Sequence, residues 1–301
     1  MKKIFSLLII VSILLACKKV PLTDRRQMNA IPNSELNASS YASYNQVLEE
    51  STLSNNTQQV EMVKRVGERI KVAVEQHLKE NNLGDATEGF EWEFNLLEEN
   101  IVNAWCMPGG KVAFYEGILP ICKDEAGIAV VMGHEVAHAI TKHGGERMTQ
   151  ALAQQLGGMA LSLALSQQPE QTQALAMAAY TGGSTILGVL PFSRLHESEA
   201  DELGIKFMAL AGYDPATAPE FWKRMKAQSE GAPPEFLSTH PSNDTRIEDL
   251  NKLLPVAKEY YAKSNKVSNN PIPNLSSITN SSSSEVKSAT KAKFKLEIDN
   301  K

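Results

Sequence analysis

His134, Glu135 and His138 stand in the spacing His-Glu-x-x-His, within the segment VMGHEVAHAITKHG. On an α-helix, residues four apart lie on one face, so both imidazoles can bind a single metal ion. Glu135 lies about 100° around the helix from His134, where its carboxylate can reach a water molecule without binding the metal. The pattern therefore predicts a zinc site with Glu135 as general base.

A hydrolytic zinc site needs a third protein ligand and keeps its fourth position for water. The longer pattern His-Glu-x-x-His-x-x-Gly-x-x-His fails, because Thr141 and Gly144 stand where its glycine and last histidine belong. His143 is the nearest extra histidine, but nine residues after His134 it points to the opposite side of a continuous helix. We interpret His143 as a last-turn residue or a packed group behind the ligands.

The segment FSRLHESEADELG, residues 192–204, offers acidic candidates for the third ligand. Glu197 and Asp201 are four apart and share a helix face, whereas Glu199 is rotated by about 200° from Glu197. We predict Glu197 as the third ligand, with Asp201 accepting a hydrogen bond from the outer N–H of a ligand histidine. His196 is a weaker ligand candidate, and a solvated acidic helix without metal is the alternative.

These segments resemble a family of zinc metalloendopeptidases that includes the CAAX prenyl protease, the heat-shock HtpX-like proteases and the mitochondrial Oma-like protease. The resemblance is carried by HEVAHAITKH (134–143), SRLHESEAD (193–201), AGYDP (211–215) and THPSNDTRI (239–247), with NAWCMPGGKVAFYEGIL (103–119) upstream. It implies a zincin-like domain with one zinc ion bound by His134, His138 and Glu197. Glu135 would be catalytic.

The same resemblance assigns further residues around the metal. It implies that His240 lies near the zinc, where it either steadies the oxyanion of the transition state or caps the metal; a helix-capping loop residue is the alternative. Arg246 is expected to orient acidic neighbours.

Substrate binding is assigned by the resemblance to the segment 103–113. In related proteases an edge strand beside the zinc binds the substrate in extended form, as an added strand of the sheet. The expected substrate-binding residues are Asn103, Ala104, Pro108, Gly109 and Gly110, since glycines let one backbone approach another. A plain glycine turn is the alternative.

The composition is that of an ordinary globular domain, with 301 residues, 42% hydrophobic and 22% charged. A net charge of −5 without a basic stripe argues against nucleic acid as a partner. We expect a lipoprotein signal peptide over 1–16, a lipid-anchored tether over 17–39, a zinc metallopeptidase domain over 40–264 and a disordered tail over 265–301. The oligomeric state stays open.

The first residues predict an envelope address. Lys2 and Lys3 precede an apolar run over 4–15, which is short for a membrane span and typical of a secretory signal. The sequence LLAC at 14–17 resembles the bacterial lipoprotein cleavage box and implies diacylglycerol on Cys17, facing the periplasm; a short signal-anchor helix is the alternative. Lys18 stands where an aspartate would favour inner-membrane retention, so we favour the outer membrane.

A periplasmic address permits disulfides, and Cys106 and Cys122 remain once Cys17 is acylated. Their spacing does not decide whether they pair.

Hydrophobic periodicity predicts an α+β fold that is mostly helical, with a small sheet beside the active-site helix. We expect helices over 57–80, 219–229 and 242–264, a short helix near 41–50, and strands over 90–95, 103–105 and 112–115. The active-site helix should begin at Asp124 and be stopped by Gly144 and Gly145. Residues 148–190 predict a buried helical hairpin, with a lid or a membrane-facing surface as alternatives.

The function expected is a zinc metalloendopeptidase acting on misfolded or misassembled envelope proteins. Its partners would be protein or peptide substrates and, through the lipid anchor, the membrane. The alternative is a zinc-stabilised chaperone or assembly factor with little turnover, which would not need Glu135. A third class, a lipid-anchored structural protein with a vestigial site, predicts no bound zinc.

Overall fold

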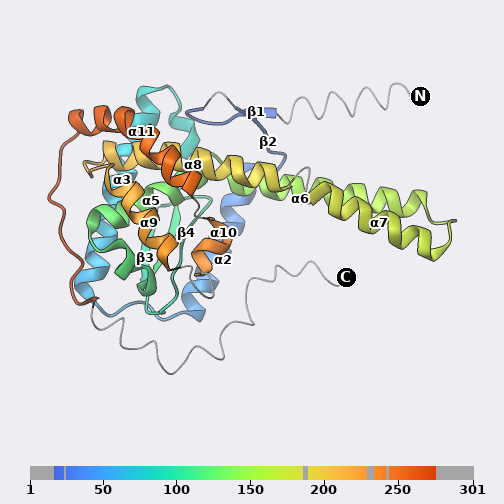
Figure 1. Ribbon diagram of the computed structural model, residues 1–301, viewed down its shortest axis with the longest axis horizontal. Helices are drawn as coiled ribbons and strands as arrows, with labels where there is room; N and C mark the ends of the chain where they lie inside the picture. The colour runs from blue at the N-terminus through green and yellow to red at the C-terminus, as the bar shows by residue number, and fades with distance from the viewer. Residues whose placement is uncertain (1–16, 24, 186–188, 229–233, 242–243, 276–301) are drawn as a thin grey trace.

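The computed structural model describes residues 17–23, 25–185, 189–228, 234–241 and 244–275 (Figure 1). The fold class is confirmed, because helices dominate and one small sheet lies beside the predicted active-site helix. The signal peptide predicted over 1–16 and the tail from 276 onward lie outside the described residues. The elements are β1 (Cys17–Lys19), β2 (Arg26–Met28), α2 (Asn33–Glu50), α3 (Thr57–Glu80), η1 (Gly84–Thr87), β3 (Glu93–Leu97), β4 (Ala104–Met107), β5 (Lys111–Tyr115), η2 (Glu116–Ile118), α4 (Leu119–Cys122), α5 (Glu125–Ile140), α6 (His143–Ala164), α7 (Glu170–Ser184), α8 (Leu190–Leu210), α9 (Thr217–Ala227), α10 (Glu235–Thr239) and α11 (Asp244–Lys263).

Helix α5 forms the centre of the molecule, and every residue from Glu125 to Ile140 is buried. Helices α3, α8 and α9 and strand β4 pack around it. Its closest approach is to α8, where Gly133 faces Gly204: a Cβ atom added to Gly133 would lie 2.7 Å from the Gly204 carbonyl oxygen. The two glycines therefore let these helices touch through their backbones, which brings the Glu197 segment of α8 close to the His-Glu-x-x-His turn of α5.

The start of α5 is as predicted, because the Asp124 carboxylate accepts a hydrogen bond from the Gly127 N–H at 2.9 Å as an N-cap. Its end is not. The helix stops at Ile140, Lys142 adopts a left-handed conformation with φ of 60°, and α6 begins at His143. The predicted stop at Gly144 and Gly145 is therefore wrong, since both glycines lie inside the first turn of α6.

The sheet has the strand order β3-β5-β4, with β3 parallel and β4 antiparallel to β5. The predicted strands around Pro108 are confirmed as β4 and β5. The strand predicted over 90–95 begins only at Glu93, because the preceding residues run beside the glycine turn, where Glu91 N–H donates to the Gly109 carbonyl at 2.8 Å. Strand β4 lies at the edge of this sheet and contacts α5.

Helices α6 and α7 form the hairpin predicted over 148–190, but it is not buried. In Figure 1 the two green helices run side by side and extend away from the other elements. No described residue of α7 is buried, and Leu163 and Leu175 are 76% and 74% exposed. Two helices without a third layer cannot enclose their apolar side chains. Among the described helices, none combines the length and hydropathy that crossing a bilayer requires.

Residues 17–39, expected as a tether, carry regular structure. Strands β1 and β2 pair antiparallel, Val20 is 1% exposed, and α2 begins at Asn33 rather than near residue 41. The described part of the predicted tail also packs against the core: Ile272 is 5% exposed, and Asn270 donates to Glu125 at 2.9 Å.

Candidate active site

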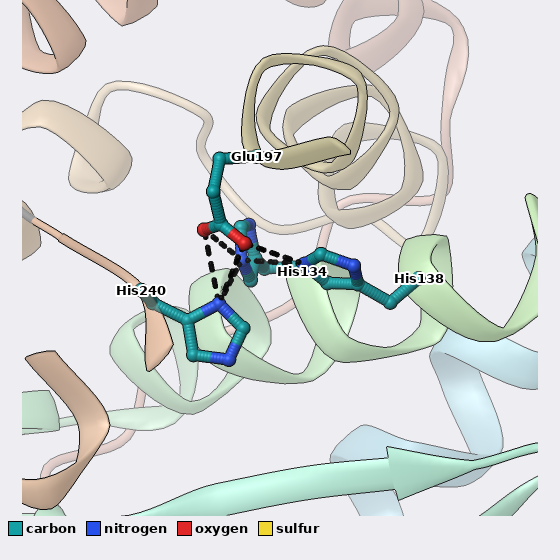
Figure 2. A group of neighbouring side chains, drawn as sticks. All are labelled: His134, His138, Glu197 and His240. Carbon is teal, nitrogen blue, oxygen red and sulfur yellow. Dashed lines mark hydrogen bonds and ion pairs between the residues drawn. The ribbon is translucent and has the colours of Figure 1, made fainter. Parts of the chain in front are cut away.

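Four side chains from three parts of the chain point toward one another (Figure 2). His134 and His138 extend from α5, Glu197 from α8 and His240 from the residue after α10. The Nε2 atoms of His134 and His138 are 3.2 Å apart. The Glu197 carboxylate lies 3.4 Å from His134 Nε2 and 3.3 Å from His138 Nε2. His240 Nδ1 lies 3.0 Å from Glu197 Oε2 and 3.1 Å from His134 Nε2.

The spacing of these donors fits zinc. Tetrahedral zinc with bonds of about 2.0–2.1 Å to nitrogen and oxygen holds its donor atoms about 3.3–3.4 Å from one another. The two Nε2 atoms are 3.2 Å apart, and the Glu197 carboxylate comes within 3.4 Å of His134 through Oε2 and within 3.3 Å of His138 through Oε1. Two imidazoles and one carboxylate are also a donor set that zinc accepts in catalytic sites. His134, His138 and Glu197 therefore suit the ligand set predicted for them, and His240 supplies a possible fourth donor.

Asp201 and Arg246 both contact the outer nitrogen of His134. Asp201 Oδ1 is 3.0 Å from His134 Nδ1, so it can accept a hydrogen bond from the outer N–H. The lone pair of Nε2 then faces the cluster. Arg246 donates to Asp201 at 2.6 Å and lies 3.3 Å from Glu197. Its guanidinium carbon sits 3.4 Å above the ring of Trp222. This stacking holds the arginine between the two carboxylates.

The ionisation states of Glu197 and His138 suit metal binding, whereas that of His134 does not. Burial opposes a charge on Glu197, but hydrogen bonds from His134 and His138 outweigh it and hold its pKa well below the usual range. Burial keeps the pKa of His138 well below its usual value. Burial also opposes a charge on His134, yet contacts with Asp201 and Glu197 raise its pKa to about 9. Zinc binding must therefore release a proton from His134.

Glu135 faces the same space with one oxygen unused. Its Oε1 is buried and accepts no hydrogen bond within the described part of the chain, and His240 Nε2 is 3.4 Å away. A buried carboxylate oxygen without a donor is costly unless water or a ligand supplies one. Burial also raises the pKa of this carboxyl, against the lowering effect of the His240 and His134 rings. The side chain is thus placed and tuned to take a proton.

A cavity of about 220 Å³ opens beside the cluster. Residues Trp105 to Pro108 of the β4 edge line one side of it, and His138 and Lys142 line another. The edge strand predicted to bind substrate therefore does border the site.

Not all the predicted substrate residues are accessible there. Gly109 and Gly110 are buried beneath Tyr41 and Trp92, and their carbonyls already accept hydrogen bonds from residues 91 and 93. Their φ values of 86° and 82° require glycine, so the plain-turn alternative explains them and the predicted backbone contact with substrate is corrected. Ala104 is 1% exposed, so neither its side chain nor its backbone is open to a substrate here. The Asn103 side chain donates to Glu235 at 3.1 Å, and Pro108 lines the cavity.

Residues outside the predicted site form a second polar cluster behind His138. His143 Nδ1 lies 2.8 Å from His138 Nδ1, because the break at Lys142 turns His143 back toward the ligand. Glu199 does face away from Glu197, as its rotation predicted, and contacts His143 Nε2 at 3.0 Å. His196, the weaker ligand candidate, contacts Glu146 at 2.9 Å and not the metal cluster. Helical spacing could not predict the contacts of His143, since they depend on the left-handed conformation of Lys142.

The two cysteines left undecided by their spacing do not pair. Cys106 and Cys122 are both free thiols. Burial raises the pKa of both, so neither is an activated nucleophile.

Comparisons with known proteins agree with this site. The mitochondrial metalloendopeptidase OMA1 of Schizosaccharomyces pombe is 38% identical over 172 residues, which cover 56% of this chain and 48% of that protein. OMA1 of Saccharomyces cerevisiae is 34% identical over 192 residues, with 59% and 51% covered. The beta-barrel assembly-enhancing protease of Escherichia coli is 30% identical over 184 residues, with 55% and 36% covered. The chain thus spans about half, or less, of the length of these relatives.

The family model of peptidase family M48 matches residues 62–254. That range contains the two histidines of α5, the acidic segment of α8 and His240, and it covers more than half of the chain. The resemblance of the motifs to zinc metalloendopeptidases is therefore confirmed, and this chain belongs to peptidase family M48.

Proposed function

We propose that the protein is a zinc-dependent metalloendopeptidase. The observation that carries this proposal is the close approach of His134, His138 and Glu197 at distances that suit zinc, with the buried carboxylate of Glu135 beside them. Membership of a peptidase family and relatives named metalloendopeptidases support it. A structural zinc site would not need Glu135.

Zinc held by His134, His138 and Glu197 would supply Lewis acidity, which polarises a peptide carbonyl and lowers the pKa of water toward about 7. Glu135 takes the proton of the attacking water and later passes it to the leaving amine. Asp201 fixes the ring of His134 through its outer nitrogen. The edge of β4 from Trp105 to Pro108 offers backbone groups along which an extended peptide can bind.

The experiment that tests the activity replaces Glu135 by glutamine and leaves every ligand in place. Glu135→Gln should bind stoichiometric zinc by elemental analysis and lose casein cleavage by orders of magnitude, because the amide cannot take a proton. His138→Ala, the matched control, should lose zinc as well as activity. A Glu135→Gln protein that cleaves casein like the wild type would overturn the assignment.

The same variant distinguishes a peptidase from the alternative, a zinc-stabilised chaperone. A chaperone would suppress aggregation of an unfolded client equally well with Glu135 or glutamine, and its wild type would show no chelator-sensitive cleavage. The buried carboxylate of Glu135 beside the proposed ligands favours the peptidase.

Misfolded or misassembled envelope proteins are the proposed substrates, and the outer membrane, facing the periplasm, is the proposed location. The support is the lipoprotein-like sequence ending at Cys17 and the E. coli relative named for beta-barrel assembly. Other relatives are named mitochondrial, so the address depends on the anchor.

Acylation at Cys17 makes that address testable. The wild-type protein should sediment with outer membranes and partition into detergent, whereas Cys17→Ser should be released as a soluble protein of unchanged fold. A wild-type protein without acyl mass would contradict the anchor and leave the peptidase assignment untouched.

A further inference from the structure

The outer nitrogen of His138 has a partner unlike that of His134. Ligand histidines usually donate their second N–H to a carboxylate or a carbonyl, as His134 does to Asp201. His138 Nδ1 instead faces another imidazole, with His143 Nδ1 at 2.8 Å. Both rings are buried, at 5% and 0% exposure, so water does not provide a substitute partner.

This contact fixes the protons of both rings when His138 binds metal through Nε2. A neutral His138 then carries its proton on Nδ1 and donates it to His143. His143 Nδ1 must be the acceptor, so its own proton lies on Nε2. That nitrogen is 3.0 Å from Glu199 Oε2, which accepts it. A directed series of hydrogen bonds thus runs from His138 to His143 and on to Glu199.

Glu199 also accepts a hydrogen bond from Arg25, which belongs to the N-terminal segment before α2. Arg25 Nε donates to Glu199 Oε2 at 2.8 Å. Its two terminal nitrogens donate to both oxygens of Glu146 at 2.9 and 2.8 Å, a bidentate pair. Glu146 in turn lies 2.9 Å from His196 Nε2.

One guanidinium therefore joins two imidazole–carboxylate pairs. The rings of His143 and His196 stack with centroids 4.1 Å apart and planes 18° from parallel, so each pair steadies the other. The Arg25 side chain is 15% exposed, while those of Glu146 and Glu199 are 2% and 9% exposed. Buried charged hydrogen bonds of this kind have a defined geometry and are costly to break.

We propose that His143, Glu199 and Arg25 are positioning residues that hold the ring of His138 for zinc, so that the N-terminal segment completes the metal site. Arg25 precedes residues 62–254 that match the family model, so this contribution comes from outside the family domain. The inference rests on the proposed zinc site but concerns a different set of residues. We call them the His138 relay.

The test measures zinc affinity of the full-length protein by competition with a chromophoric chelator. His143→Leu, which fills the space but accepts no hydrogen bond, should weaken zinc binding about 10- to 100-fold, the range found for partners behind metal ligands. His143→Asn should recover much of the affinity, because its amide oxygen can lie where Nδ1 lies. Arg25→Gln acts one step further away and should cost about 10-fold, the lower end of that range.

A matched control removes another arginine that donates to a buried glutamate. Arg65 donates to the buried Glu125, the first residue of α5, at 2.6 Å. Arg65→Gln should lower the melting temperature without changing the zinc dissociation constant. If Arg25→Gln and Arg65→Gln affect zinc equally, the relay has only a structural role and the proposal fails.

A measurement on the wild type keeps the proposal testable even if His143→Leu does not fold. Nitrogen-15 NMR of the histidine rings in the zinc-loaded protein should show the proton of His143 on Nε2 and that of His138 on Nδ1. A proton on His143 Nδ1 would overturn the relay. A wild type that binds no zinc would instead overturn the proposed function, so the two failures are distinguishable.

Discussion

His240 is a possible fourth protein donor to the metal cluster. Its Nδ1 lies 3.1 Å from His134 Nε2 and 3.0 Å from Glu197 Oε2, close enough for it to join them on one metal ion. A site with four protein donors is closed, whereas hydrolysis needs one position for water and substrate. Of the two functions implied for His240 by the resemblance, capping the metal therefore fits this arrangement better than steadying the oxyanion.

Replacing His240 by alanine should open the site. We expect His240→Ala to bind zinc more weakly and to cleave casein faster than the wild type, because a protein donor no longer competes with water. The measurements are a chelator competition and initial rates at saturating zinc. A lower kcat with unchanged KM would instead assign His240 to the transition state.

At the scale of the elements, the site depends on how closely α5 and α8 approach. Gly204 is the critical position on α8: a Cβ atom there would lie 2.8 Å from the His134 backbone nitrogen. No flexible side chain can give way, because the neighbour is helix backbone. The close approach of Gly133 and Gly204 therefore helps to set the distance between Glu197 and the two imidazoles. Neither glycine belongs to the metal cluster itself.

Gly204→Ala should accordingly push the helices apart. We expect a loss of about 1–3 kcal/mol in the free energy of unfolding, typical of overpacking, together with weaker zinc binding. Gly182→Ala in α7 is the matched control, since nothing lies within 4 Å of its added methyl group. That variant should be neutral or more stable by up to about 1 kcal/mol, because alanine favours helix. Denaturant unfolding with and without zinc measures both effects. Equal behaviour of the two variants would contradict the packing argument.

The α6–α7 hairpin is a second element whose surroundings matter. Leu156, Met159 and Leu163 of α6 are 55%, 62% and 76% exposed, and only Glu170 is charged between Arg147 and Arg194. An apolar surface of this kind typically contacts another surface. The lid and the membrane-facing surface remain predictions, while the buried hairpin is excluded by its exposure.

For the whole molecule, the metal would join segments that are far apart in the sequence. His134 and His240 are 106 residues apart, and Glu197 comes from a helix between them. A ligand that binds only the folded state adds stability of about 4 kcal/mol at a free concentration of 1,000 times its Kd. Zinc bound by these residues would thus be coupled to the fold.

Removing zinc should therefore destabilise the whole domain and not one loop. We expect dialysis against a chelator to lower the melting temperature measured by circular dichroism, and added zinc to restore it. His138→Ala should show no response to the chelator, which serves as the control. A wild-type melting temperature that is insensitive to chelator and to zinc would contradict this coupling.

Local sequence was sufficient to identify the chemistry. The spacing of His134, Glu135 and His138, the helical pair of Glu197 and Asp201, and the apolar period of α3 all concern neighbours within one helix, where geometry follows from 3.6 residues per turn. The predicted bounds of α3 and the predicted start of the active-site helix at Asp124 hold for the same reason. Spacing within helices says nothing about contacts between them, so the prediction of Glu197 as third ligand rested on the need of hydrolytic zinc for a third donor, and the family resemblance then supported it.

The tertiary structure decided everything that depends on long-range packing. The left-handed Lys142 ends α5 early and turns His143 toward His138, and Arg25 reaches Glu199 across 174 residues of sequence. Gly109 is a turn residue with a positive φ, and Tyr41 covers it, so its backbone is not open to a substrate. The hairpin is exposed because no third layer covers it. Such contacts arise from the complete three-dimensional arrangement, since a side chain's partner across the core is set by how whole elements pack and not by its neighbours in the chain.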